Sequence, residues 1–251
     1  MQPYLISTDA ESRPWKRTTL RELKRNEAFL EQVVASNPEV LGLDPYETGI
    51  SRSVEVFRQA TPQTPTGRDI TPNIVLLTES GHVVIVEAKL ADNPELKGRQ
   101  VVAQVVEYAA SVANLGDEEL LAWLDAEPGE SWRGFVRRTF PKVQDSDRLA
   151  AAIRRRMRDA ELHLVIVCDG APEGLREFVA AVAGQAALGE FRLHVVELTP
   201  YTVEGVQDVL LVPTSKVETE IVARTAITVN SVDLKQRVVS VNATSPEETA
   251  D

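Results

Sequence analysis

The feature that most constrains this chain is a pair of apolar, β-branched runs separated by a short polar turn. Residues 74–77 form the first run and residues 82–90 the second. Short runs of this kind, bounded by turn-forming residues, are typical of β-strands. A three-residue loop that ends at Gly81, with this glycine in the left-handed conformation, closes a hairpin in which Thr78 faces His82. That register places Asn73 opposite Glu87.

The second run carries two charged residues among its valines. Side chains alternate between the faces of a strand, so Glu87 and Lys89 share one face. We therefore expect both to meet Asn73 on one exposed patch. Oxygen ligands beside a lysine suit metal-assisted phosphodiester cleavage, because the oxygens bind Mg²⁺ or Mn²⁺ and the lysine stabilises or activates the nucleophile. The alternative is a solvated surface pair, although charged residues are less expected inside a long β-branched run.

The segment after the hairpin predicts a helix. Residues 93–95, Asn-Pro-Glu, open a turn or a first helical step, and apolar residues then recur at helical spacing from Val101 to Val112. Gln104 and Tyr108 lie four residues apart, so they share one side of this helix and can reach the same edge of the sheet. An ordinary amphipathic helix, with a half-buried tyrosine and a solvated glutamine, is the alternative.

Together, Glu87-Ala88-Lys89 on a strand and Gln104-x-x-x-Tyr108 on the next helix resemble the PD-(D/E)XK restriction-endonuclease-like superfamily. The similarity is greatest to members that carry a Gln-x-x-x-Tyr helix after the Glu-x-Lys strand. It implies an α/β fold with a mixed central sheet flanked by helices, and a Mg²⁺- or Mn²⁺-dependent nuclease that acts on DNA. The implied catalytic residues are Glu87, Lys89, Gln104 and Tyr108, the last two orienting the lysine or a substrate phosphate.

The same resemblance extends to both sides of these motifs. Residues 26–42 look like the first helix of that fold, from which an acidic residue joins the metal site. Glu31 is the first candidate for this role and Glu27 the second, so the implied metal ligands are Glu87, Asn73 and Glu31. The strand–helix–strand that completes the domain is expected at residues 163–169, 175–183 and 192–198.

Asn73 departs from the family pattern, which has an aspartate at this position. Hard divalent cations favour charged oxygens, so we expect a neutral amide to weaken metal binding and turnover. Asp69 can replace the missing carboxylate only across a bulge, since four residues of regular strand span about 13 Å. The second interpretation is a catalytically inactive nucleic-acid-binding or assembly module of a bacterial repair or defence system. A third is a partner in such a complex that binds protein alone.

A local basic segment stands out in an acidic chain. The formal net charge of −11 argues against binding nucleic acid through the overall field, but residues 131–160 carry a local excess of positive charge. We expect this segment to contact DNA phosphates, with Trp132 and Phe135 available to stack on a base. The alternative is a solvated helix whose arginines pair with acidic neighbours. The candidate DNA-contacting residues are Arg154, Arg155, Arg156 and Arg158.

Other features bound the location and organisation of the chain. No apolar run is long enough to cross a membrane, and the first four residues lack the pattern of a secretion signal. The single cysteine, Cys168, excludes an internal disulfide and suits a reducing cytoplasm, where we expect the protein and interpret this residue as a small buried side chain. His82, His163 and His194 are isolated in the sequence, so we expect them on the surface or at strand ends.

We predict one main domain at residues 18–213, with a helical insertion at residues 116–160. Residues 1–17 are expected to form a flexible arm. Residues 214–251 are expected to form a C-terminal extension that ends in an acidic tail. A homodimer and a complex with another protein both stay open.

Overall fold

The structure, a computed structural model, describes residues 4–6, 12–43, 54–58, 71–97, 100–183, 191–204 and 208–218. The strands are β1 (Tyr4–Ile6), β2 (Ser12–Pro14), β3 (Lys16–Arg17), β4 (Val54–Arg58), β5 (Ile74–Thr78), β6 (Val83–Lys89), β7 (His163–Cys168), β8 (Arg192–Thr202) and β9 (Leu210–Glu218). The helices are α1 (Glu27–Ser36), the 3₁₀ turn η1 (Pro38–Leu41), α3 (Pro94–Lys97), α4 (Gln100–Ala113), α5 (Asp117–Trp123), α6 (Trp132–Thr139), α7 (Ser146–Arg158) and α8 (Glu173–Ala183).

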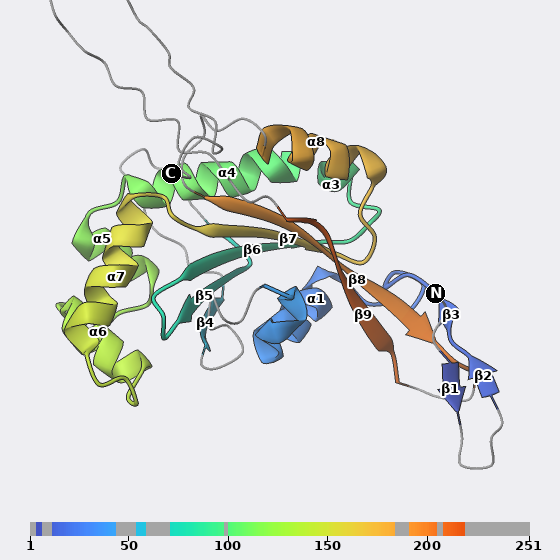
Figure 1. The fold of residues 1–251 in the computed structure, drawn as a ribbon, viewed down its shortest axis with the longest axis horizontal. Coiled ribbons are helices and arrows are strands. Elements are labelled where there is room, and N and C mark those ends of the chain that lie inside the picture. Colours follow the sequence, from blue (N-terminus) through green and yellow to red (C-terminus); the bar gives the residue numbers. More distant parts are fainter. Residues whose placement is uncertain are drawn as a thin grey trace, which may run out of the picture.

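A seven-stranded mixed sheet organises the molecule. Its order is β3-β8-β7-β6-β5-β4, and β9 also pairs with β8. Strands β6, β7 and β8 run parallel to one another, whereas the β4–β5–β6 and β8–β9 pairs are antiparallel. Helices α4 and α8 lie on one side of the sheet and α1 on the other (Figure 1). The predicted α/β class, with a mixed sheet flanked by helices, is confirmed.

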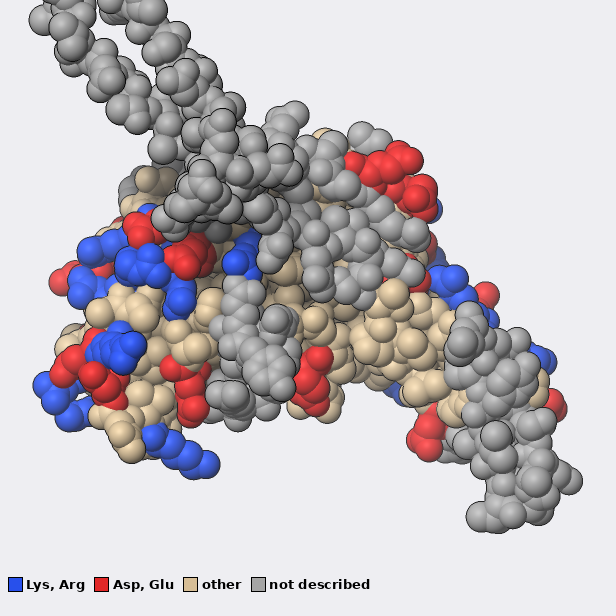
Figure 2. Space-filling model, viewed as in Figure 1, with Lys and Arg blue, Asp and Glu red and all other residues tan. Residues whose placement is uncertain are grey.

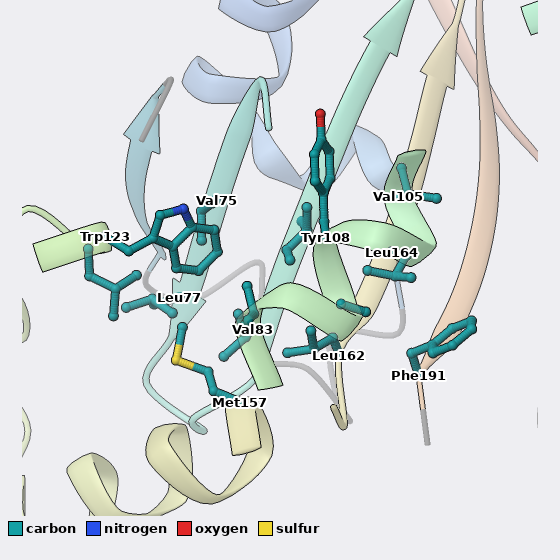
Figure 3. Packing of buried hydrophobic residues seen from close by; sticks show 14 of the residues in the cluster. Val75, Leu77, Val83, Val105, Tyr108, Trp123, Met157, Leu162, Leu164 and Phe191 are labelled. Atoms are coloured by element: carbon teal, nitrogen blue, oxygen red, sulfur yellow. The ribbon is translucent and has the colours of Figure 1, made fainter. Parts of the chain in front are cut away.

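Two hydrophobic clusters fill the two faces of the sheet because side chains alternate along each strand. The larger cluster joins Val83 and Ile85 of β6 to the buried side of α4, as Figure 3 shows around Val105 and Tyr108. The smaller cluster joins the alternate residues of the same strands to Leu30 of α1. The core strands are buried on both faces, which explains why they read as continuous apolar runs.

The predicted hairpin is present in the predicted register. Leu77 pairs with Val83, and the Thr78 amide donates to the His82 carbonyl at 3.1 Å. Gly81 has φ of +82°, the left-handed conformation that the three-residue loop needs. It also lies against α7, where an added Cβ would come within 2.9 Å of the Ala152 Cβ. Both the turn and the packing of α7 therefore require glycine at this position.

One predicted domain boundary falls at the end of a strand, and another falls inside a strand. Lys16 and Arg17, in the expected flexible arm, pair with Thr202 and Tyr201 of β8 and so belong to the sheet. The expected boundary at residues 213–214 lies within β9. β3 has two residues, too few to show a strand pattern, and β9 contains Pro213, a residue that weakens a strand prediction. The acidic tail and Asp69 lie outside the described residues.

The predicted insertion at residues 116–160 contains three helices, α5, α6 and α7, which lie together at one end of the sheet (Figure 1). Trp123, Phe135 and Met157 from these helices are buried in the larger cluster. The insertion is therefore part of the core. No helix in the described ranges is long and apolar enough to span a membrane.

We predict that Gly81→Ala destabilises the protein by about 2–4 kcal/mol, because a left-handed alanine is strained and its Cβ collides with α7. Gly129→Ala is the matched control, since Gly129 has φ of +77° but nothing within 4 Å of an added Cβ. That control isolates the conformational cost, about 1–2 kcal/mol. Urea denaturation followed by circular dichroism measures both values. Equal losses in the two variants would show that the close packing against α7 is unimportant.

Candidate active site

Glu87 lies near the carboxyl end of β6, at the position that the hairpin register sets opposite Asn73. Ile74 pairs with Val86, so the next pair outward is Asn73 with Glu87. The neighbouring residues Val86 and Ala88 belong to the α1 side of the sheet, and α4 contacts Glu87 from the other side. The prediction that Glu87 and Lys89 share one face of the strand agrees with this arrangement.

The Glu87 carboxylate is enclosed by α4. Gln104 Nε2 donates to Glu87 Oε1 at 3.0 Å, and the Tyr108 hydroxyl donates to Glu87 Oε2 at 3.3 Å. Gln104 Nε2 also donates to the Tyr108 hydroxyl at 2.6 Å, which locks the two helix residues together. The expectation of an exposed patch is wrong for this residue, since Glu87 is only 2% exposed. Alternation along a strand identifies a face, but it does not show which helix covers that face.

Burial dominates the protonation of these groups. It raises the pKa of Glu87, although the charge of Lys89 and hydrogen bonds from Lys89, Tyr108 and the backbone of Asn73 act in the opposite direction. Burial and the charge of Glu87 also raise the pKa of Tyr108, so its hydroxyl keeps its proton. Figure 3 shows this hydroxyl pointing away from the labelled apolar side chains. Tyr108 thus acts as a hydrogen-bond donor to the carboxylate.

Lys89 is held between two carboxylates. Its Nζ lies 3.1 Å from Glu87 Oε1 and 2.8 Å from Glu95 Oε2, and its side chain is 12% exposed. Burial lowers the pKa of Lys89, but the hydrogen bond to Glu95 and the charge of Glu87 outweigh it and leave the pKa raised. The ammonium is therefore charged at neutral pH. Such a group stabilises an anion and does not act as a base.

Asn73 joins α1 to the hairpin. Its Oδ1 accepts the Ala88 amide at 2.7 Å, and its Nδ2 donates to Glu31 Oε1 at 3.2 Å. The Ala88 amide fixes which atom of the Asn73 side chain is the oxygen, because only that atom can accept this bond. Glu31 is buried, so the hydrogen bond from the Asn73 amide replaces part of the hydration that the Glu31 carboxylate lacks. Asn73 and Glu31 thus meet, as predicted, but through a hydrogen bond.

Glu27, the second candidate from α1, forms hydrogen bonds to the segment that follows β6. Its Oε1 accepts from the Leu90 amide at 3.2 Å and from Asn93 Nδ2 at 2.8 Å. Asn93 Oδ1 in turn accepts the Glu95 amide at 2.9 Å. Glu27 is therefore a structural anchor that positions the start of α3, and with it Glu95.

The donor set fits a divalent cation poorly in this arrangement. Within the described ranges, no group of three or more His, Cys, Asp or Glu side chains could hold a metal ion. Glu87 and Glu31 supply the anionic oxygens of the predicted ligand set, whereas the Asn73 amide turns its NH₂ toward Glu31. The Asn73 oxygen is engaged by the Ala88 amide, so the side chain presents a hydrogen-bond donor to Glu31 and not an oxygen ligand.

The four predicted DNA-contacting arginines all have protein partners. Arg154 and Arg158 pair with Asp117, Arg155 pairs with Glu161, and Arg156 donates to the Ser80 carbonyl at 2.9 Å. Positive and negative side chains are intermixed over α5–α7 (Figure 2). This arrangement agrees with the alternative of paired surface charges.

The two aromatic side chains expected to stack on a base are not available for it. Trp132 is 8% exposed and Phe135 is fully buried, and both belong to the larger hydrophobic cluster. Both residues belong to α6, and their rings pack edge to face with 6.1 Å between the centroids. The apolar period of this short helix places both of them toward the core.

Three histidines that are distant in the sequence form a row. His82 Nδ1 lies 3.2 Å from His163 Nε2, and His163 Nδ1 lies 3.3 Å from His194 Nε2. His163 begins β7, as a strand-end residue should, but His163 and His194 are buried and not on the surface. Burial, with nearby positive charge, lowers the pKa of His163 to about 2 and that of His194 to about 4. Cys168, at the end of β7, is buried as predicted.

No protein-family model, curated protein or solved structure matches this chain. The resemblance to the PD-(D/E)XK superfamily therefore stays a prediction from the sequence motifs. Glu95 is the residue of the site that the motifs missed. Its signal was the Asn-Pro-Glu turn placed directly after the Glu-x-Lys strand, at residues 93–95.

We predict that Asn73→Asp lowers the free energy of unfolding by about 1–3 kcal/mol at pH 7 in a chelator, because it faces a second carboxylate toward Glu31. The loss should shrink as the pH falls and one carboxylate takes up a proton. It should also shrink when Mn²⁺ is added. Asn73→Ala is the control, since it removes the hydrogen bonds without adding charge. Thermal melts at pH 5 and pH 7 test this, and a pH-independent loss equal to that of Asn73→Ala would contradict it.

The histidine row predicts that stability falls in mild acid. The folded-state pKa values of His163 and His194, about 2 and about 4, lie below the ordinary histidine value. Their contribution to the free energy of unfolding is therefore complete above about pH 6.5 and is lost as the pH falls toward the folded-state values. Each residue contributes at most about 1.4 kcal/mol per pH unit. Urea denaturation at pH 7 and pH 5 should show a smaller loss for a His163→Leu/His194→Leu variant than for wild type. Equal losses would contradict the prediction.

Proposed function

We propose that this chain is a nuclease-like domain that acts on the phosphodiester bonds of DNA, with activity that depends on Mg²⁺ or Mn²⁺ and is weakened by Asn73. One observation carries the proposal. Glu87 and Lys89 from β6 meet Gln104 and Tyr108 from α4 through contacts of 2.6–3.3 Å. Motif spacing alone predicts these four residues, and the other three all contact the buried carboxylate of Glu87.

The geometry supports a distinct role for each residue. Lys89 is charged, so it can bind a phosphate oxygen and stabilise the negative charge that develops during cleavage. Gln104 and Tyr108 hold the two oxygens of Glu87 in fixed positions. Glu87, whose pKa is raised, is the group in this cluster best suited to exchange a proton with a bound water.

A second function is favoured by Asn73. Its amide already forms hydrogen bonds to Glu31 and Ala88, so the domain needs no cation to hold α1 against the sheet. A site of this kind can bind DNA at Lys89 without cleaving it. The alternative is therefore a catalytically inactive nucleic-acid-binding or assembly module of a bacterial repair or defence system.

Cleavage of supercoiled plasmid and of a single-stranded oligonucleotide, with Mg²⁺ or with Mn²⁺, tests the proposal. We expect weak wild-type activity, a loss of about 100-fold or more in Lys89→Met because a charge-stabilising donor is removed, and a gain in Asn73→Asp because an anionic oxygen is added. Glu118→Gln, which removes an exposed charge on α5, is the matched control and should equal wild type. If folded wild type and Asn73→Asp are both inert, the nuclease proposal fails and the binding module is favoured.

A further inference from the structure

We propose that Glu95 is a positioning residue that holds the Lys89 ammonium before substrate binds and that a phosphodiester must displace from it. This inference rests on the proposed function. It adds a residue outside the recognised motifs and specifies an anion as the ligand that the site selects.

The two carboxylates around Lys89 differ in how firmly they are held. Glu87 is buried and is fixed by Gln104 and Tyr108. The Glu95 side chain is 47% exposed, and Lys89 is its only ion-pair partner in the part of the chain that the structure describes. Glu95 nevertheless makes the shorter contact, 2.8 Å against 3.1 Å. The solvent-facing partner of Lys89 is thus the one that can leave.

The backbone of Glu95 is anchored by hydrogen bonds, whereas its side chain is half exposed and pairs with Lys89. Asn93 accepts the Glu95 amide and donates to Glu27 of α1, which also accepts the Leu90 amide. These bonds tie the start of α3 to the end of β6. Release of Lys89 therefore needs only a side-chain rotation of Glu95, with no movement of the helix.

The charge balance selects the ligand. Glu87, Lys89 and Glu95 together carry one excess negative charge. The site therefore repels anions while Lys89 is paired with both carboxylates. An ammonium has three donors and no acceptor, so what replaces Glu95 must be an acceptor, and a charged acceptor binds more strongly than a neutral one. A partly exposed ion pair is weak, so a phosphate oxygen of DNA can compete with Glu95 for Lys89. Glu95 thus reduces the affinity for phosphodiesters while keeping Lys89 in position.

A double-mutant cycle tests this inference. Binding of a fluorescent single-stranded oligonucleotide is measured by anisotropy in a chelator, which prevents metal-dependent cleavage, for wild type, Glu95→Gln, Lys89→Met and the double variant. We expect Glu95→Gln to bind about two- to fivefold more tightly than wild type, since it frees Lys89 without changing size. The gain should disappear in the Lys89→Met background. Glu118→Gln controls for the change in net charge.

The outcomes separate this inference from the proposed function. If wild type binds but Glu95→Gln binds no better than Glu118→Gln, or if its gain persists without Lys89, the role of Glu95 is wrong and the proposed function is untouched. If neither wild type nor Glu95→Gln binds, both fail. Lys89→Met leaves Glu87 buried without its cation and can lose its fold, so a second measurement uses Lys89 itself.

That second measurement is the pKa of Lys89, followed through its side-chain signals by heteronuclear NMR. Because the Glu95 hydrogen bond raises this pKa, Glu95→Gln should lower it. Glu95→Asp, which keeps the charge, should give a value closer to wild type. An unchanged Lys89 pKa in Glu95→Gln would show that Glu95 does not hold the ammonium in solution, and that result would overturn the inference.

Discussion

The burial of one carboxylate, that of Glu87, is the constraint on which the rest of the site depends. A carboxylate removed from water costs several kcal/mol unless it is paired and hydrogen-bonded. β6 places Glu87 under α4, where 2% of it remains exposed, so the partners must come from α4 and from β6 itself. Gln104 and Tyr108 provide two donors one helical turn apart, and Lys89 provides the cation from two residues along the strand. Their spacing in the sequence is therefore a consequence of satisfying one buried charge.

That arrangement then determines what Lys89 can do. A lysine committed wholly to Glu87 would be a structural counter-ion, but Lys89 is shared with the more exposed Glu95. One side of the ammonium maintains the fold, and the other faces a group that water can reach. Glu27 and Asn93 fix the backbone on that second side, so α1 acts on the site from the opposite face of the sheet. The polar contacts of α1 and α3 thus form one connected network around the end of β6.

The sequence predicted the elements that obey local rules. Alternation along residues 82–90 and the left-handed glycine at position 81 determine the hairpin register, and helical spacing pairs Gln104 with Tyr108. Features that depend on distant contacts were not predictable in this way. Nothing local indicates that His163 and His194 stack across two parallel strands, or that the arginines of α7 find Asp117 on another helix. The burial of Glu87 was not predictable for the same reason. Alternation along the strand shows which residues share a face of the sheet, but it does not show that α4 covers that face.

Asn73 shows how a single amide changes the chemistry of such a site. An aspartate here would place a second negative charge 3.2 Å from the Glu31 oxygen, an arrangement that is stable only with a proton or a cation between the two. The amide removes that need, because its NH₂ donates to Glu31 and its oxygen accepts from Ala88. The structural demand for metal is thus met by hydrogen bonds, while the positive charge at Lys89 is kept. Under the proposed function, loss of the cation site would weaken cleavage, whereas anion binding would depend on the release of Lys89 by Glu95. For this reason, binding and cleavage have to be measured separately in this protein.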